Sequence, residues 1–251
     1  MSNREQYPRI SLELTGEQVD QGQKLELPER ESHYLQNVLR LKTGEKLILS
    51  CQRNSWLCTL IESSQIKIES PWQTTESLSF VKTLAFATCK GDKNELVIQK
   101  ATELGVQSIL LWQSQNSVAK IPSEKIAKKL ARWKSIAQAA CAQSKRNNCP
   151  QIEISSNLAQ TLDIIKQKNS EQKIFFASTA INSKLLKNLD LRPSQMHLLI
   201  GPEGDFSSQE IDELQHAGAM PFSLGPQILR SETAAIAAVS AINALLGFRT
   251  L

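Results

Sequence analysis

The sequence is poor in the residues that build metal and disulfide sites. It has three histidines, and its five cysteines are odd in number and form no CxxC pair. None of these residues has the spacing of zinc ligands, so we expect no metal ion. Scattered cysteines of this kind are typical of buried free thiols in a reducing compartment.

Long apolar runs are also absent. No stretch approaches the roughly 18 apolar residues of a membrane span, and the first residues lack the apolar segment of a signal peptide. We therefore expect a cytoplasmic protein without membrane contact. The length of 251 residues, with 41% hydrophobic and 22% charged residues, suits one large or two smaller globular domains. The formal net charge of +4 is only a weak indication of an acidic partner such as nucleic acid.

The first part of the chain has the pattern of a small β domain. Its short β-rich runs, separated by glycine turns, cover residues 9–14, 23–27, 46–50, 56–61 and 65–69. A short helix is expected at residues 32–41. Residues 70–77 are polar and contain proline, which is typical of a linker. We therefore predict a β-barrel-like domain over residues 1–72.

From residue 78 onward, strand and helix patterns alternate. Strands are expected at residues 78–88, 106–112, 152–154 and 173–177. Helices are expected after the capping residue Asp92 and over residues 123–142 and 158–167. Such alternation predicts a parallel α/β sheet with helices on both faces, in a domain over residues 78–251.

Two glycine-containing loops stand out near the end of the chain. In the first, an apolar strand at residues 196–200 leads into Gly-Pro-Glu-Gly and then a helix, with Ser207 and Glu210 spaced as a capping box. In the second, residues 224–233 lead into the last helix. Strand, glycine loop and helix start together bring backbone N–H groups to a ligand. We therefore expect the two loops to form one pocket.

The residues in these loops restrict the classes of ligand that can bind there. The lysine of a phosphate loop, the GxGxxG of a dinucleotide loop and the GxSxG of a nucleophilic serine are all missing. Glu203 and Asp205 would repel a phosphate, so a neutral or cationic ligand fits better. The alternative is a tight turn with incidental acids. In the second loop, Arg230 and Glu232 flank Ser231, the expected N-cap. The alternative here is an ordinary helix cap in which Arg230 and Glu232 form a surface ion pair.

The last helix, at residues 231–246, is apolar nearly all round, which is typical of a helix buried on every side. At the end of a chain this favours contact with a second subunit, the alternative being a helix covered by its own domain. Basic residues occur in both halves of the chain. We interpret Lys128 and Lys129 as a solvated helix face, while positive charges from the two domains together suit a polyanion.

Five motifs in order resemble one family. They are HYLQNVLRLKTGE (33–45), KGDKNELVIQKATELGV (90–106), AQSKRNNCPQI (142–152), LLIGPEGDFSSQE (198–210) and LGPQILRSETAAIAA (224–238). This set resembles the bacterial 16S rRNA uracil-N3-methyltransferases, the ribosomal small-subunit methyltransferase E family of the knotted SPOUT class. The chain departs from the family pattern at Asp205, where a glycine is usual, and at Tyr34, where a second histidine is frequent.

The resemblance implies a fold, a cofactor and partners. The fold would be a PUA-like RNA-binding β-barrel at residues 1–72 and a SPOUT α/β domain with a trefoil knot at residues 78–251. S-adenosylmethionine would bind in the knot of a homodimer, and the substrate would be 16S rRNA in the small ribosomal subunit. The residues that would form the cofactor site are Ile200, Gly201, Glu203, Gly204, Leu224, Gly225, Ile228, Leu229 and Thr233.

The resemblance also suggests roles in the reaction. Arg230 would stabilise negative charge on the uracil oxygens, and Glu203 or Glu232 would accept the N3 proton. The residues that would contact RNA phosphates are Arg9, Arg40, Lys90, Lys100 and Arg146. Two alternatives stay open: a SPOUT methyltransferase for another rRNA or tRNA nucleotide, and a non-catalytic RNA-binding ribosome assembly factor. Binding of S-adenosylmethionine would distinguish the enzymes from the assembly factor.

Overall fold

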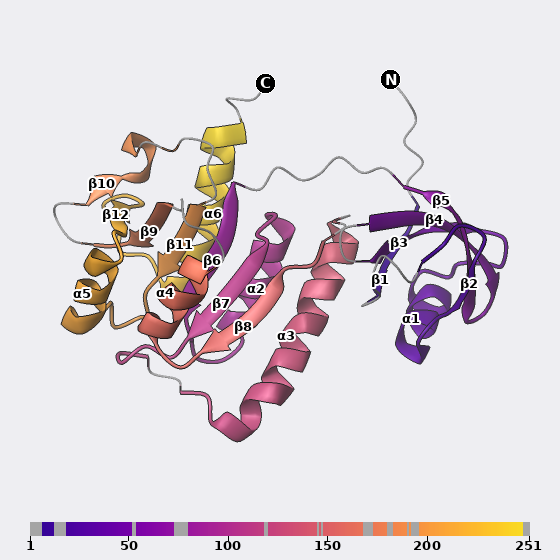
Figure 1. Ribbon diagram of the computed structural model, residues 1–251, viewed down its shortest axis with the longest axis horizontal. Helices are drawn as coiled ribbons and strands as arrows, with labels where there is room; N and C mark the ends of the chain where they lie inside the picture. Colours follow the sequence, from indigo (N-terminus) through magenta and orange to yellow (C-terminus); the bar gives the residue numbers. More distant parts are fainter. Residues whose placement is uncertain are drawn as a thin grey trace. The chain divides into compact units, whose positions relative to one another are not determined.

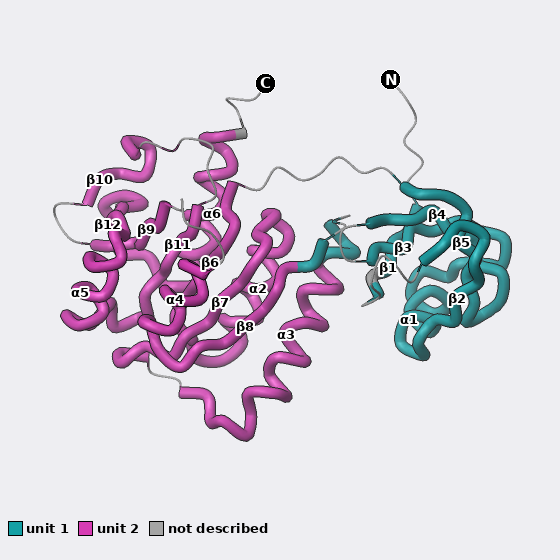
Figure 2. Tube along the Cα trace, viewed as in Figure 1, with its two compact units in different colours: residues 1–77, 141–149 teal, residues 78–140, 150–251 magenta. Residues whose placement is uncertain are grey.

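The computed structural model describes most of the chain, as two compact units. The described residues are 7–12, 19–51, 54–72, 80–117, 120–144, 146, 148–167, 173–179, 183–189, 191 and 196–247. Unit 1 comprises residues 1–77 and 141–149, and unit 2 comprises residues 78–140 and 150–251 (Figure 2). The predicted domain boundary falls largely on residues 73–79, which lie outside the described residues.

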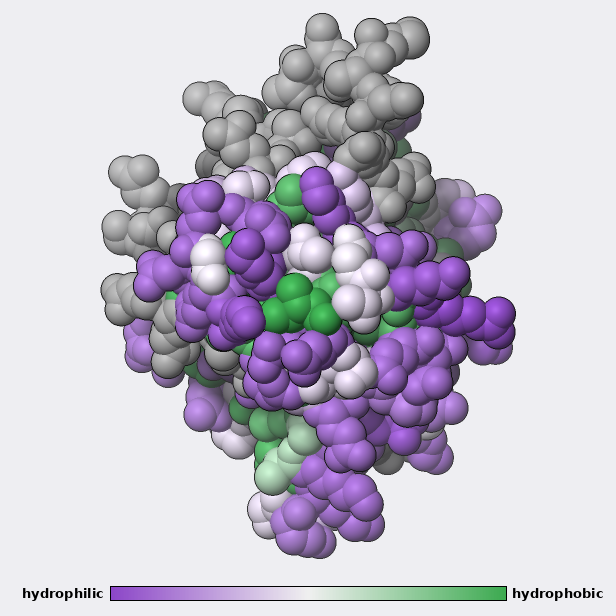
Figure 3. All heavy atoms as spheres, turned by 90° about the vertical axis from the view of Figure 1, so that its right-hand side faces the viewer, coloured by the Kyte–Doolittle hydropathy of each residue, from purple (hydrophilic) through white to green (hydrophobic). Residues whose placement is uncertain are grey.

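Unit 1 is built on a five-stranded sheet with the order β1-β3-β4-β5-β2. Its strands are β1 (Arg9–Leu12), β2 (Lys24–Glu26), β3 (Lys46–Cys51), β4 (Asn54–Glu62) and β5 (Gln65–Pro71). Aliphatic side chains such as Leu47, Leu60 and Ile66 fill its core. The face in Figure 3 is mostly hydrophilic, with a small hydrophobic area near its centre. The expected N-terminal β domain is therefore present. The predicted linker is wrong at its start, because β5 continues to Pro71 and Trp72 N donates to Ser55 O at 2.7 Å.

The helix of unit 1 differs from the prediction in both ends and type. It consists of α1 (Glu29–His33) followed by a π-helical turn, η2 (Tyr34–Val38). It begins earlier than expected because Pro28, whose carbonyl accepts from Ser32 N, occupies the N-cap. It ends before residue 41 because Arg40 has a φ of 53°, a left-handed conformation that a helix cannot continue through.

Unit 2 contains one seven-stranded sheet in which all neighbouring strands are parallel. The order is β10-β12-β9-β11-β6-β7-β8 (Figure 1). The strands are β6 (Val81–Ala87), β7 (Ser108–Trp112), β8 (Gln151–Ser155), β9 (Lys173–Ala177), β10 (Lys184–Leu185), β11 (Met196–Ile200) and β12 (Met220–Ser223). The predicted parallel α/β sheet is confirmed, although β10 was not predicted. The trefoil knot stays a prediction.

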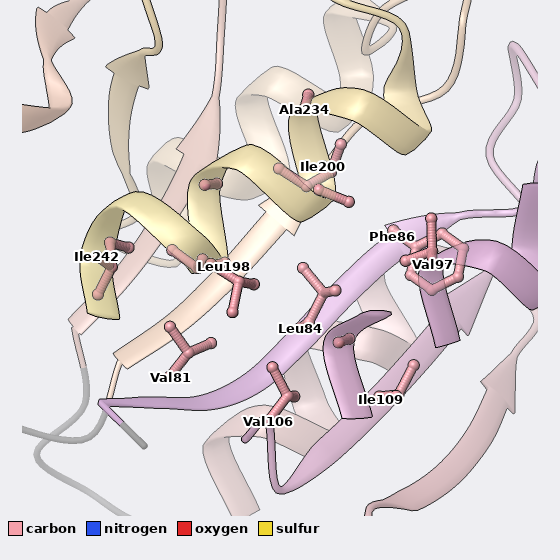
Figure 4. Close-up of a cluster of buried hydrophobic side chains, with 14 of the residues drawn as sticks. Val81, Leu84, Phe86, Val97, Val106, Ile109, Leu198, Ile200, Ala234 and Ile242 are labelled. Atoms are coloured by element: carbon pink, nitrogen blue, oxygen red, sulfur yellow. The ribbon is translucent and has the colours of Figure 1, made fainter. Parts of the chain in front are cut away.

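Helices cover both faces of this sheet. They are α2 (Lys93–Glu103), α3 (Ser123–Gln143), α4 (Leu158–Gln167), α5 (Ser208–His216) and α6 (Ser231–Gly247), with a short 3-10 turn, η3 (Leu186–Asn188). Side chains alternate along each strand, so Leu84 and Phe86 of β6 pack with α2 and α6, while Ala85 and Ala87 pack with α4 and α5. Figure 4 shows α6 lying along β11 above Leu198.

Helix ends follow local signals, with one correction. Helix α2 stops where expected, because Gly105 has a φ of 95°. Asp92 does stand at its N-cap, but its side chain makes no capping hydrogen bond, so the predicted cap is wrong in this detail. Among the described residues, no helix is both long and apolar enough to cross a membrane.

Among the described residues, the last helix, α6, is not covered on all sides. It packs against α2, β6 and β11 through a continuous set of buried residues that includes Ala235, Val239 and Ile242. On the opposite side Thr233, Ser240 and Ala244 are exposed. The alternative in which the chain's own domain covers the whole helix is therefore wrong.

The packing of β11 beneath α6 predicts a stability effect. Leu198 is fully buried, so Leu198→Ala should lower the free energy of unfolding by about 2–5 kcal/mol through lost burial and the cavity left behind. Denaturant unfolding followed by circular dichroism measures this change. Leu185→Ala, at a leucine that is 39% exposed, is the control and should cost far less. Equal losses in both variants would contradict the assigned core.

Candidate functional site

Three loops gather at the carboxyl edge of the unit 2 sheet. They follow β6, β11 and β12 and cover residues 88–92, 201–206 and 224–230. Strands β6 and β11 are parallel neighbours, so their loops leave the sheet side by side. The third loop is joined to the second by a hydrogen bond, which Ser231 Oγ donates to Gly201 O at 2.8 Å. The two glycine loops singled out in the sequence therefore meet.

Opposite charges connect all three loops. Lys93, the first residue of α2, places its Nζ 3.1 Å from Glu203 Oε1 and 3.4 Å from Glu232 Oε2. The hydrogen bond to Glu203 raises the pKa of Lys93, the charge of Glu232 adds to the effect, and burial acts against it. Two predicted catalytic acids thus share one cation that the sequence interpretation had not assigned to the site. Its only signal was a lysine at a helix start, where an acid is usual.

The third predicted catalytic residue, Arg230, is exposed at the start of α6. Its carbonyl accepts from Ala234 N at 2.8 Å, so Arg230 occupies the N-cap position. The prediction that Ser231 is the N-cap is therefore wrong. The hydroxyl of Ser231 is used instead for the bond to Gly201 that joins the loops.

The shape of the first loop depends on an aromatic side chain. A Cβ atom on Gly201 would lie 2.9 Å from the ring of Phe206, so no larger residue fits. Phe206 stacks on Trp112 with 6.2 Å between ring centroids and meets Phe176 edge-on at 5.7 Å. The glycine thus lets the backbone lie against a rigid aromatic cluster.

Asp205, where the chain departs from the family pattern, has a backbone conformation that favours glycine. Its φ is 61°, in the left-handed region that aspartate tolerates better than most residues. Its carboxylate accepts from Phe206 N at 2.8 Å and from Thr179 Oγ1 at 3.2 Å. These hydrogen bonds offset the backbone strain.

Neighbouring segments hold the first loop in place. Asn116 Nδ2, from the loop after β7, donates to Asp205 O at 3.1 Å, and Ser114 Oγ donates to Glu210 Oε2 at 3.0 Å. Glu210 also accepts from Ser207 N at 2.9 Å, while Ser207 Oγ accepts from Glu210 N at 3.2 Å. The predicted capping box is confirmed. Asn116 and Ser114 had no signal in the sequence.

The loop after β6 is clamped by Asn94. Its Oδ1 accepts from Cys89 N at 2.9 Å, and its Nδ2 donates to Cys89 O at 2.8 Å. Burial raises the pKa of Cys89 to about 11, although a hydrogen bond with Ser231 acts in the opposite direction. Cys89 is therefore a protonated thiol at neutral pH. Among the described residues, no group of three or more His, Cys, Asp and Glu side chains is placed to hold a metal ion.

The residues predicted to bind the cofactor differ widely in exposure. Ile200 is buried at the end of β11, whereas Ile228 is 86% exposed and Leu229 is 38% exposed on the third loop. The others line the same two loops: Gly201, Leu224 and Gly225 are half-buried, while Glu203, Gly204 and Thr233 are exposed. A loop that presents two large apolar side chains to solvent suits a site completed by a ligand or a second chain.

The five predicted RNA contacts are of three kinds. Arg40 and Lys90 are exposed. Lys100 Nζ lies 2.9 Å from both carboxylate oxygens of Glu103. Arg9 and Arg146 are half-buried, and burial lowers the pKa of each guanidinium. Arg40 and Lys90 therefore have the side chains most available to a phosphate.

Comparisons with known proteins point in one direction. A model of the RNA methyltransferase domain matches residues 76–243, and one of the RNA methyltransferase PUA domain matches residues 27–69. The chain is 32% identical over 250 residues to ribosomal RNA small subunit methyltransferase E of Bacillus subtilis, covering 94% of this chain and 95% of the relative.

Two solved structures are similar over nearly the whole chain. A methyltransferase from Legionella pneumophila, in complex with the cofactor SAM, is 33% identical with a TM-score of 0.83, covering 95% of this chain and 98% of that one. A ribosomal RNA small subunit methyltransferase E from Neisseria gonorrhoeae, bound to S-adenosyl methionine, is 30% identical with a TM-score of 0.82, covering 96% and 98%.

The two bonds to the Asp205 carboxylate predict the order of stability of its variants. Asp205→Gly should lower the free energy of unfolding by about 1 kcal/mol, because it loses the hydrogen bonds but suits a positive φ. Asp205→Ala should cost about 1 kcal/mol more, because alanine adds the strain of a left-handed backbone. Denaturant unfolding of both variants and the wild type measures the order. An alanine variant more stable than the glycine variant would contradict this account.

Proposed function

The chain belongs to the ribosomal RNA small subunit methyltransferase E family, and from that premise we propose that it methylates N3 of one uridine in 16S rRNA. It is an S-adenosylmethionine-dependent rRNA methyltransferase. The observation that carries the proposed site is the junction of the two glycine loops, which Ser231 and Gly201 make with one hydrogen bond. The choice of N3 of uridine rests on the five sequence motifs.

The residues at this junction fit S-adenosylmethionine, which supplies an activated methyl group on a positively charged sulfur. Glu203 and Glu232 provide negative charge, which suits a cation and not a phosphate. The exposed Ile228 and Leu229 provide apolar surface for a flat ring. The other residues that we propose to shape the cofactor site are Ile200, Gly201, Gly204, Leu224, Gly225 and Thr233.

We assign the remaining chemistry to Arg230 and the two acids. Uracil N3 keeps its proton at neutral pH, so the proton has to leave as the new bond forms. Arg230, exposed at a helix start, is placed to stabilise negative charge on a uracil oxygen. Glu203 or Glu232 accepts the proton, directly or through water. The target base has to leave its stack to reach these groups.

The RNA is proposed to be held by both units. The match of residues 27–69 to a PUA domain model supports an RNA-binding role for unit 1. The phosphate contacts that we propose are Arg9, Arg40, Lys90, Lys100 and Arg146. We propose that the substrate is the assembled small subunit, which places the enzyme in the cytoplasm with the ribosomes.

We also propose that the enzyme is a homodimer with a knotted methyltransferase domain. The exposed side of α6, with Thr233, Ser240 and Ala244, supports the proposal that a second copy of the chain packs against this helix. Small side chains there permit close approach of two helices. The exposed Ile228 at the start of this helix adds apolar surface.

The function is tested by the product. Mass mapping of 16S rRNA from small subunits treated with the protein and S-adenosylmethionine should show one added methyl group on N3 of one uridine. Arg230→Ala should slow single-turnover methylation by about 100-fold or more, because charge stabilisation at the reacting group is lost, while calorimetry shows unchanged cofactor affinity. A methyl group on another atom would refute the N3 assignment, and full activity of the variant would remove Arg230 from the mechanism.

The dimer is tested by sedimentation. At micromolar concentration the wild type should sediment with twice the mass of one chain. Ser240→Arg, which adds a charge to the exposed side of α6, should shift it to the monomer, because an unpaired charge disfavours a close helix contact. Lys67→Arg, on the exposed part of β5 in unit 1, is the control. A monomeric wild type would refute the dimer.

A further inference from the structure

Lys93 occupies a position where helix energetics disfavour a cation. It is the first residue of α2, and the free N–H groups of a helix start carry partial positive charge. An acid here would stabilise the helix, whereas a lysine costs stability unless anions lie nearby. Two carboxylates do lie nearby, one from the loop after β11 and one from the start of α6, both distant in the sequence. The contribution of this lysine is therefore its ion pairs with the two acids, and it does not stabilise its own helix.

The two carboxylates depend on this lysine to different extents. Glu203 is partly exposed and accepts a hydrogen bond from Lys93 at 3.1 Å. Glu232 is only 9% exposed, and its Oε2 has no hydrogen-bond donor in good geometry within the described part of the chain. Lys93 at 3.4 Å is the positive charge that this oxygen faces. Without Lys93, two like charges would stand close together, one of them nearly buried.

The other charged and titratable groups around this cluster do not replace Lys93. Cys89, from the loop after β6, is a neutral thiol because burial raises its pKa to about 11. Asp92 and Lys90, on the same loop, are exposed, as is Arg230 next to Glu232. Lys93 forms the ion pairs with both acids. With one lysine and two glutamates, the cluster keeps one net negative charge.

We propose that Lys93 is a positioning residue of the methyl-transfer site, which holds Glu203 and Glu232 side by side toward the cationic cofactor. The inference rests on the proposed function, since it takes S-adenosylmethionine as the ligand. By pairing with both acids, Lys93 holds the segments that follow β6, β11 and β12 in one arrangement.

Calorimetry of S-adenosylmethionine binding at pH 7 tests this role. Lys93→Met should bind the cofactor about tenfold more weakly than the wild type, because the two acids are no longer held in one arrangement before binding. Lys93→Arg keeps the charge and should restore the affinity.

Two further variants distinguish a loss of positioning of the acids from a loss of folding. Lys93→Met combined with Glu232→Gln has no unpaired buried carboxylate, so it should fold even if the single variant does not, and it should still bind the cofactor weakly. Lys67→Met removes an exposed lysine whose Nζ lies 3.8 Å from Glu69 Oε1 in unit 1 and should match the wild type. A Lys93→Met variant that folds and binds the cofactor as tightly as Lys67→Met would overturn the proposal. Failure of the wild type to bind the cofactor would instead refute the proposed function.

Discussion

The hydrogen bond from the hydroxyl of Ser231 to the carbonyl of Gly201 joins the two loops on which the site is built. It is possible only because Gly201 has no side chain, since the ring of Phe206 fills the space where a Cβ atom would lie. Phe206 in turn is held by Trp112 at the end of β7. The loop after β11 is thus held against aromatic side chains at the end of the sheet. A site built on this loop gains rigidity from the strands beneath it.

Charge provides the second level of organisation. The helix starts at this edge direct partial positive charge toward the site, yet the loops carry Glu203 and Glu232 and bind Lys93 between them. The negative charge of the acids suits the sulfonium cofactor that we propose for this site. The same lysine lies between two like charges. In the proposed mechanism, Arg230 stabilises the negative charge of the reacting base.

The two units divide the work that such an enzyme has to do. Unit 2 supplies the sheet edge, the loops and the partly uncovered helix α6. Unit 1 supplies a β domain with the exposed Arg40. A target nucleotide inside a large RNA cannot be selected by a small cofactor pocket alone, and the match of residues 27–69 to a PUA domain model supports the proposal that unit 1 contributes to that selection.

Local sequence patterns determined the local structure. Helix α4 and strand β9 have the predicted bounds, and the Ser207–Glu210 capping box is present, because periodicity and capping depend on residues only a few positions apart. The pattern of strand, glycine loop and helix start also identified the two glycine loops. Only the tertiary structure placed β11 between β6 and β9, directed the hydroxyl of Ser231 to Gly201, and paired Lys93 with Glu203 across 110 residues of chain. Contacts of that separation arise from the order in which strands pair, and no local pattern encodes that order.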